Sequence, residues 1–421
     1  MNYAEQMLDA LEKGNVDQAR TLFKQVLDNE NDETKYNLAE ELYAMGFTGQ
    51  AKRLYQELLG HYPDDGDVLT ALADIAVSDG DTDQAISYLD RVHEDNPAYV
   101  QALIAAADVY QTQGLYEVSL QKLTTARELD PDEPVIIFAL GELQFDWGHF
   151  AQAAAAYLEL LDGGEMNIAG VNVRLRYAES LAQTGRFEDA ISVYQEVGED
   201  TLPIADRFQI GGLYVQVEEF QRAADAFQAV IDADASYTNA YLPLAQAQRK
   251  LGQPDAALLT IQNGLAQDDT NPELYSVGAE LALAQEDDEL GERYLRAALK
   301  LDPENQHYVL AWSNFLLHAG RDQENIDYLD SLDAGGESDP QLYWNLARAY
   351  ERVENYADAR ANYLLAFRTF QDQPAFLREI GAFFRTTGAR AEETAALTRL
   401  VAMQPDDLDA QDRLDELKDE N

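Results

Sequence analysis

The segment from Gln101 to Pro134 carries two stretches with apolar residues at helical spacing, separated by Gly114. The apolar or small positions are Leu103, Ala106, Ala107 and Tyr110 in the first stretch, and Tyr116, Leu120, Leu123 and Ala126 in the second. Each stripe covers one face of a helix, so neither helix is stable alone in water. The pair still leaves an outer apolar face, which predicts that neighbouring segments pack against it.

The same pattern recurs around a series of turn residues along the whole chain. The predicted turns are Gly14, Gly46, Gly80, Gly114, Gly148, Gly185, Glu218, Gly252, Glu286, Gly320, Glu354 and Gly388. Most neighbouring turns are 34 residues apart. A small residue recurs five positions after the turn and seven before it, and a large apolar residue recurs nine positions after it. Small residues let paired helices approach closely, and large ones fill the space between pairs.

This register resembles the tetratricopeptide repeat family, whose period is 34 residues. The overall layout is also similar to that of YpiA-type repeat proteins of Gram-positive bacteria. The resemblance implies an all-α fold, a right-handed superhelical solenoid of about twelve helix-turn-helix repeats. Its first helices would line a concave groove and its second helices would cover the convex back. We expect the solenoid to span residues 1–405 as one folded unit, followed by a polar C-terminal capping helix over 406–421.

Two regions depart from the regular pattern. The step from Gly148 to Gly185 is 37 residues, and the insertion contains Gly163 and Gly164, so we predict a flexible joint near residues 162–170. Repeats near residues 272–339 are predicted to be weaker, because Gly291 and Asn325 stand where alanine recurs elsewhere. Glycine at such a position costs a helix about 1 kcal/mol relative to alanine.

The composition indicates a soluble protein with a sizeable core. Hydrophobic residues make up 46% of the 421 residues, and there are no cysteines, which excludes disulfides and thiolate metal sites. The N-terminus lacks a basic stretch followed by an apolar one, so we expect no secretory signal. No apolar run approaches the ~20 residues that span a bilayer. We therefore expect a cytoplasmic protein without membrane insertion.

The formal net charge of −48 restricts the choice of partners. Such a surface repels phosphates, so nucleic acid is not an expected partner. Three interpretations of the acidity stay open at this stage. It keeps a long solenoid solvated, it reflects a salt-adapted organism, or it attracts basic partners.

No motif predicts catalysis, a metal or a cofactor. The histidines, His61, His93, His149, His307 and His318, are scattered along the sequence. The segment beginning DGDTDQ at Asp79 resembles the start of a calcium loop. It has Gln84 and Asp90 where that loop requires glycine and glutamate. Nucleotide-binding and nucleophile motifs are absent from the sequence. We expect no enzyme.

The candidate binding site is the groove implied by the resemblance, lined by residues ten, six, three and two before each turn. The predicted acidic-aromatic part comprises Tyr36, Glu40, Tyr43, Asp74, Asp108, Phe138, Glu142, Phe145, Asp146 and Glu179. The predicted basic part comprises Arg249, Lys250, Asn314, His318, Trp344, Asn345, Arg348, Arg352, Arg378 and Arg385. Arginine grips carboxylates through two hydrogen bonds, and exposed Trp and Tyr are common binding anchors.

Two interpretations of the basic residues stay open. They bind an acidic partner, or they pair with neighbouring acids such as Glu351 and Glu379. Some members of the family clamp a partner's C-terminal carboxylate, and Asn314 and Asn345 match two positions of that clamp. Its basic positions are occupied here by Leu310, Ala375 and Glu379, so the resemblance does not extend to that function.

The sequence therefore favours a non-enzymatic scaffold that binds protein or peptide partners in the groove. The alternative is a structural protein that self-associates into homo-oligomers, acidic groove against basic groove. An enzyme ranks third.

The scaffold hypothesis makes one prediction from sequence alone. Reversal of Arg348 and Arg352 to glutamate should abolish capture of an acidic partner without unfolding the protein, as measured by partner recovery from lysate. Unchanged recovery would contradict the role of the basic groove.

Overall fold

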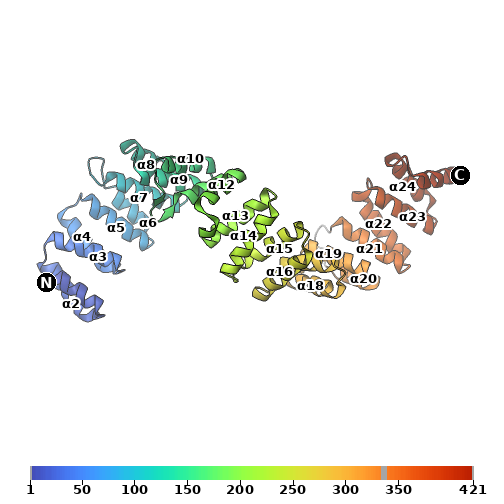
Figure 1. Ribbon diagram of the computed structural model, residues 1–421, viewed down its shortest axis with the longest axis horizontal. Helices are drawn as coiled ribbons and strands as arrows, with labels where there is room; N and C mark the ends of the chain where they lie inside the picture. The colour runs from blue at the N-terminus through green and yellow to red at the C-terminus, as the bar shows by residue number, and fades with distance from the viewer. Residues whose placement is uncertain (1, 333–338, 420–421) are drawn as a thin grey trace. The chain divides into compact units, whose positions relative to one another are not determined.

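The computed structural model describes residues 2–332 and 339–419. The chain forms two compact units, Met1–Val217 and Glu218–Asn421. Figure 1 colours the first unit from blue to green and the second from yellow-green to red. Within each unit, consecutive helices pack against one another in chain order.

The first unit contains thirteen α-helices within its described part. Its elements are α1 (Tyr3–Glu12), α2 (Val16–Asn29), α3 (Asp32–Ala44), α4 (Thr48–His61), α5 (Gly66–Ser78), α6 (Thr82–Leu89), α7 (Tyr99–Thr112), α8 (Tyr116–Leu129), α9 (Pro134–Asp146), α10 (Phe150–Asp162), β1 (Asn167–Ile168), β2 (Val171–Asn172), α11 (Val173–Gln183), α12 (Phe187–Val197), the 3-10 helix η1 (Glu199–Thr201) and α13 (Ile204–Gln216).

The second unit is also helical over its described residues. Its elements are α14 (Phe220–Ala233), the 3-10 helix η2 (Thr238–Ala240), α15 (Tyr241–Lys250), α16 (Pro254–Gln267), α17 (Pro272–Ala284), α18 (Asp288–Leu301), α19 (Gln306–His318), α20 (Asp322–Ser331), α21 (Pro340–Arg352), α22 (Tyr356–Phe370), α23 (Pro374–Thr387), α24 (Arg390–Met403) and α25 (Leu408–Asp419). The helices α1 to α24 alternate as first and second helices of the predicted repeats, which confirms the all-α solenoid of about twelve repeats.

All twelve predicted turn residues adopt positive φ angles between 60° and 82°. This left-handed conformation ends a helix and lets the next residue donate a hydrogen bond back into the last turn. The Phe47 amide donates to the Leu42 carbonyl oxygen in this way, at 2.7 Å. Nine of the turns use glycine, which adopts positive φ without strain. Glu218, Glu286 and Glu354 adopt the same conformation.

The recurring small residues lie where the helices of a pair meet. Ala85, Ala153 and Ala190 are fully buried. The large residues nine positions after each turn are buried too, with Tyr157 and Tyr363 at 0% exposure. The core is therefore a row of small clusters between successive helix pairs.

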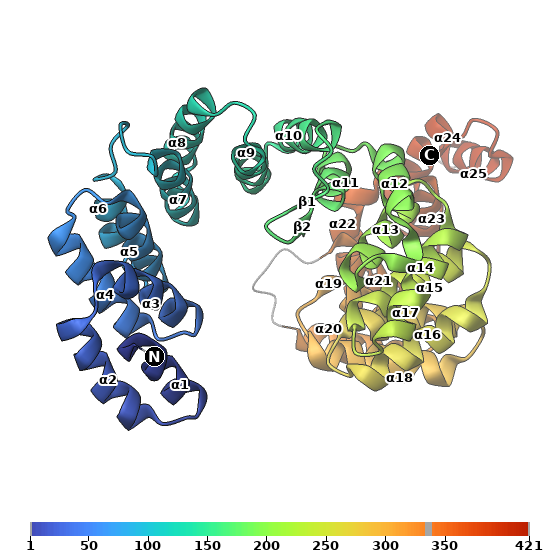
Figure 2. The ribbon, with the colours of Figure 1, turned by 60° about the vertical axis from the view of Figure 1, so that its left-hand side comes forward.

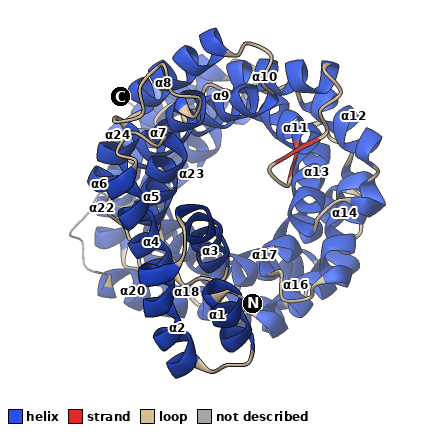
Figure 3. Ribbon diagram, turned by 90° about the vertical axis from the view of Figure 1, so that its left-hand side faces the viewer, coloured by secondary structure: helices blue, strands red, loops and turns tan. Residues whose placement is uncertain are grey.

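The three-residue insertion after α10 forms a short antiparallel hairpin, which the sequence pattern did not predict. Strands β1 and β2, red in Figure 3, pair Asn167 with Asn172 and Ile168 with Val171. Ile168 is buried against Ile137 and Tyr157. The predicted flexible joint at residues 162–170 stays a prediction, and the two compact units meet in the sequence at Val217 and Glu218.

Gly291 and Asn325, which stand where alanine recurs in other repeats, both lie within continuous helices. Helix α18 is continuous through Gly291, where an added Cβ would lie 2.5 Å from Leu283 Cδ2. Asn325 is fully buried, and its amide has no hydrogen-bond partner among the described residues. An unsatisfied buried amide costs about 1–3 kcal/mol. The lower stability of the repeats near 272–339 stays a prediction, and residues 333–338 lie outside the described residues.

The C-terminal helix has the predicted capping character. Helix α25 packs Ala410, Leu414 and Leu417 onto the last repeat, and most of its other described side chains are exposed. Arg413 fixes it to α24 through Glu393, with Nε 2.7 Å from Oε1.

The close contact at the small positions predicts a sharp difference between two alanines of α10. Ala153→Leu should destabilise the protein by about 1–3 kcal/mol through overpacking, because Ala153 is fully buried. Ala155→Leu, two residues away on the exposed side of the helix, should change stability by less than about 0.5 kcal/mol. Urea denaturation midpoints measure both, and equal midpoints would contradict this packing.

Candidate functional site

Each unit presents one face built from the first helix of each repeat, which we call the first-helix face. On this face, the residue six before one turn meets the residue nine before the next turn. The cross-repeat pairs are Glu142 with Arg176 at 2.5 Å, Asn314 with Asn345 at 2.7 Å, and Arg348 with Glu379 at 2.5 Å. The repeat therefore places defined side chains opposite each other on neighbouring first helices.

Three predicted acids of unit 1 occupy the first position of such a pair, but alanine occupies the second. These positions are Glu40 with Ala71, Asp74 with Ala105, and Asp108 with Ala139. All three acids are exposed. Within residues 2–332 and 339–419, no lysine, arginine or histidine forms an ion pair with them. Helices α3, α5 and α7 therefore carry a row of carboxylates without cations.

A hollow of about 210 Å³ lies between α5 and α7, where Ala105 leaves space. Figure 2 shows these two helices side by side. The lining residues include the apolar Val77 and Val109 and the carboxylates of Asp74 and Asp108. Although Asp74 is open to solvent on one side, partial burial raises its pKa above the ordinary 3.8, and the charge of Asp108 raises it further. The hollow therefore holds negative charge that the protein does not neutralise.

The equivalent place between α9 and α11 is filled by the side chain of Arg176. Its Nη2 lies 2.5 Å from Oε2 of Glu142, and its Nη1 lies 2.9 Å from Oε2 of Glu179. The guanidinium carbon lies 5.0 Å from the ring centre of Phe145, close enough for a cation–π contact. Hydrogen bonds to the two glutamates raise the arginine pKa despite partial burial, which opposes them. Arg176 therefore joins two repeats through acids from both.

Three further predicted residues of unit 1 contact side chains of other helices. Tyr36 is half-buried and meets Tyr55 edge-on at 5.9 Å between ring centres. The Tyr43 hydroxyl lies 3.4 Å from the hydroxyl of Ser78. Asp146 accepts a hydrogen bond from the Gln111 amide at 2.7 Å.

In unit 2 the central predicted arginine is engaged within the protein. Arg348 binds both carboxylate oxygens of Glu379, at 2.7 Å from Nε and 2.5 Å from Nη2. Trp344 Nε1 donates to the same carboxylate at 2.8 Å, and the Tyr363 hydroxyl donates at 3.0 Å. Burial alone would raise the pKa of Glu379, but the hydrogen bonds from Arg348 and Trp344 lower it below the ordinary 4.5.

Most of the remaining predicted basic residues are also paired. Arg249 binds Glu280 at 2.9 Å, Arg352 binds the Leu317 carbonyl at 2.8 Å and Asp322 at 3.2 Å, and Arg378 binds Asp407 at 2.5 Å. Lys250, His318 and Arg385 are exposed, and none forms an ion pair with an acid in the described ranges. The interpretation that the arginines pair with neighbouring acids therefore accounts for Arg249, Arg348, Arg352 and Arg378. Reversing Arg348 and Arg352 would break these internal bonds, so that variant does not isolate partner binding.

Three predicted groove residues are buried, and their interpretation as exposed groove residues is wrong. Phe138 is 9% exposed and packs on Tyr157. Trp344 is 7% exposed and packs between Phe370 and Phe376. Both side chains pack against the second helix of their own repeat, and Trp344 also contacts the first helix of the next repeat through Phe376. Asn345 is fully buried and donates to the exposed Asn314 and to Ser313.

Sequence reasoning missed Arg176, the only arginine that joins two acids on the first-helix face of unit 1 in the described part of the chain. Its position, nine before Gly185, is not one of the four predicted lining positions, although the predicted set includes one residue nine before a turn, Asn345 before Glu354. Glu379 holds the same position before Gly388. The position nine before the turn could therefore have been recognised as a pairing position, because it carries an acid in unit 2, Glu379, and a base in unit 1, Arg176.

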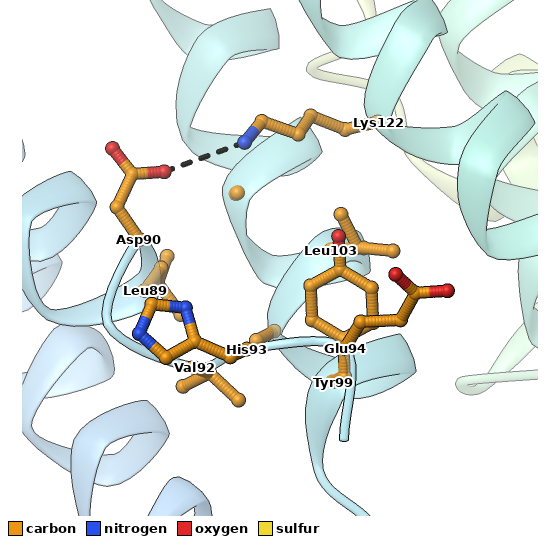
Figure 4. A pocket seen from close by; sticks show the side chains of 10 residues that line it. Leu89, Asp90, Val92, His93, Glu94, Tyr99, Leu103 and Lys122 are labelled. Carbon is orange, nitrogen blue, oxygen red and sulfur yellow. Dashed lines mark hydrogen bonds and ion pairs between the residues drawn. The ribbon is translucent and has the colours of Figure 1, made fainter. Parts of the chain in front are cut away.

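A second hollow, of about 150 Å³, lies beside the short helix α6. Figure 4 shows Lys122 reaching across it to Asp90, at 3.3 Å, with His93 and Tyr99 below. This ion pair closes one side of the hollow with the protein's own charges.

The described residues contain neither a cluster that could hold a metal ion nor a helix that could span a membrane. Over 2–332 and 339–419, no three histidine, aspartate or glutamate side chains group so as to hold a metal ion. In the same ranges no helix has the length and apolar character needed to cross a membrane.

Family comparisons identify repeats over most of the chain. Families described as YpiA-like tetratricopeptide repeats match residues 111–165 and, in a C-terminal form, 340–407. General tetratricopeptide repeats match 214–281 and 278–340, and the ARM repeat of tetratricopeptide repeat protein 21 matches 2–114.

Individual relatives agree with this result. The TPR repeat-containing protein YpiA of Bacillus subtilis (strain 168) is 32% identical over 394 residues, which cover 93% of this chain and 92% of the relative. Among solved structures, the APC/C hetero-tetramer Cut9-Hcn1 is similar at 14% identity, with 98% and 95% of the two chains covered and a TM-score of 0.40. YrrB, described as a TPR protein with an unusual peptide-binding site, is similar at 16% identity, with 47% and 97% covered and a TM-score of 0.39.

The Glu379 cluster predicts a pH-dependent stability. Glu379→Gln should destabilise the protein by about 1–3 kcal/mol at pH 7, because half-buried Arg348 loses its charged partner. The lowered pKa of Glu379 means that this contribution is present above the ordinary 4.5 and is lost as the pH falls through the lowered value. Denaturation midpoints from pH 7 to pH 3 measure the effect. Glu304→Gln, in an exposed loop, is the matched control. A difference between wild type and Glu379→Gln that persists unchanged to pH 3 would contradict the assignment.

Proposed function

The chain belongs to the YpiA-like family of tetratricopeptide repeat proteins, and we propose that it is a non-enzymatic scaffold that binds protein or peptide partners. Proteins of this repeat family generally mediate protein–protein interactions. The proposal assigns the binding to the first-helix face of unit 1 and gives its partners basic character.

The row of uncompensated acids supports this assignment. Elsewhere on the first-helix faces, Glu142 and Glu379 are matched by arginines of the chain itself. Glu40, Asp74 and Asp108 have alanines at the matching positions. Like charges held on one face repel each other, so the row costs stability that an incoming cation would restore.

Tyrosines beside the acids add contact area suited to a peptide. Tyr36 and Tyr43 are half-buried at the same face, and tyrosine combines a large apolar ring with a polar tip. Burial raises the pKa of Tyr36, and the charge of Glu40 raises it further, so its hydroxyl stays a hydrogen-bond donor at neutral pH. The face therefore offers rings and carboxylates in alternation.

The arginines of unit 2 give less support to the predicted basic part of the groove than the acids of unit 1 give to the acidic-aromatic part. Its internal pairs occupy most of the arginines, and the exposed basic residues without ion pairs are separated along the unit. A partner that follows the acidic row of unit 1 accounts for the geometry better than one held mainly by the arginines.

Neutralising the row tests this function. The triple variant Glu40→Gln, Asp74→Asn and Asp108→Asn should reduce partner recovery about tenfold or more, if each acid contributes roughly 0.5 kcal/mol. Affinity purification from lysate of the source organism, quantified by mass spectrometry, measures the loss. Binding to the wild type should also weaken as salt screens the charges.

The matched control removes the same charges elsewhere in unit 1. Asp28→Asn, Asp95→Asn and Glu128→Gln change exposed acids away from the first-helix face. This control should keep the partners that the triple variant loses. Equal recovery by both variants would contradict the proposed binding face.

A further inference from the structure

The hollow between α5 and α7 and the Arg176 site between α9 and α11 occupy equivalent positions of the repeat. Each lies between two acids six residues before consecutive turns, Asp74 and Asp108 in one case, Glu142 and Glu179 in the other. The residue nine before the second turn is Ala105 in the hollow and Arg176 in the filled site. The two places therefore differ chiefly in whether the chain supplies a cation.

The filled site shows how this position of the repeat holds a guanidinium. Arg176 reaches one acid from each repeat, at 2.5 Å and 2.9 Å, through separate nitrogens. Its guanidinium carbon lies over the ring of Phe145, three residues before the first turn. The corresponding residue of the hollow is Val77, which also provides an apolar wall. Two carboxylates from neighbouring repeats and an apolar wall suit a guanidinium group, which is planar and carries several hydrogen-bond donors.

The empty site has the space and the charge for the same group. Its volume, about 210 Å³, is several times the ~30 Å³ that one water molecule occupies in the liquid. Tyr43 and Ser78 add hydroxyl groups at its rim. The pKa of Asp74 is raised because its carboxylate is partly buried and lies near the charge of Asp108, with no cation between them.

We propose that this hollow binds an arginine side chain of a partner protein, which takes the place that Arg176 takes between α9 and α11. The proposal rests on the proposed function and names the chemical group that the unit 1 face recognises. Lysine fits less well, because an ammonium group lacks the planar fork that lets Arg176 reach two acids and lie on a ring.

Three pentapeptides test the recognition directly, with the sequence acetyl-Gly-Ser-X-Ser-Gly-amide and X as arginine, lysine or citrulline. Citrulline keeps the shape of arginine and removes its charge. Methyl NMR spectra of the full chain report binding through Val77, Val109 and Leu89, whose methyl groups line the hollow. The arginine peptide should shift these signals and bind about tenfold or more tightly than the citrulline peptide, with lysine between them. Equal shifts with arginine and citrulline would overturn the proposal.

A variant that fills the hollow from within provides the second test. Ala105→Arg places an arginine where the repeat has Arg176, so the protein should keep its fold and lose the response of the three methyl groups to the arginine peptide. Gln121→Arg adds the same charge at an exposed position of α8 and should leave the response intact. If Ala105→Arg does not fold, Asp108→Asn serves instead and should weaken binding about fivefold or more. An unchanged response in a folded Ala105→Arg or Asp108→Asn variant would overturn the proposal.

The peptide experiment and the triple acid variant can fail independently of each other. If the peptides fail but the triple acid variant still loses its partners, the face binds proteins without an arginine pocket at α5 and α7. If the triple variant loses nothing while the peptides bind as expected, the hollow recognises arginine but does not define the partners of the protein.

Discussion

Close contact between the two helices of each repeat is the constraint on which the rest of the structure depends. Ala85, Ala153 and Ala190 are fully buried at this contact, where a larger side chain would force the helices apart. Tight packing at one fixed position sets the rotation of each helix about its axis. That rotation decides which residues of the first helix point to the first-helix face. The cross-repeat pairs therefore follow from packing in the core.

Charge on that face is distributed by the same register. In unit 1 the acid comes first, as Glu142, and the base follows one repeat later as Arg176. In unit 2 the order is reversed, with Arg348 first and Glu379 second. The fold accepts either order because the two positions are neighbours in space and the backbone makes no distinction between them. Differences between faces can thus arise by exchanging side chains at two positions, with the core left unchanged.

The sequence predicted the fold well because its signals are local and repeated. The turn positions, the buried alanines and the capping helix follow from spacing, and even the three glutamates at positive φ were placed by their neighbours in the series. The face was harder to predict. Burial of Trp344 depends on Phe370 and Phe376, and the role of Arg176 depends on Glu142, 34 residues away in the sequence. Such contacts are set by how one repeat meets the next. The hairpin at Ile168 has too few residues to show a period.

The turns of the second unit carry one further consequence. Glutamate and glycine alternate there, because Glu218, Glu286 and Glu354 are each followed by a glycine turn, at Gly252, Gly320 and Gly388. A glutamate in the left-handed conformation is strained by roughly 1 kcal/mol, whereas glycine is not. Judged by its turn residues, the repeating unit of this part of the chain is two consecutive helix pairs, one with a glutamate turn and one with a glycine turn. A duplication that preserves the alternation would lengthen the array by an even number of repeats.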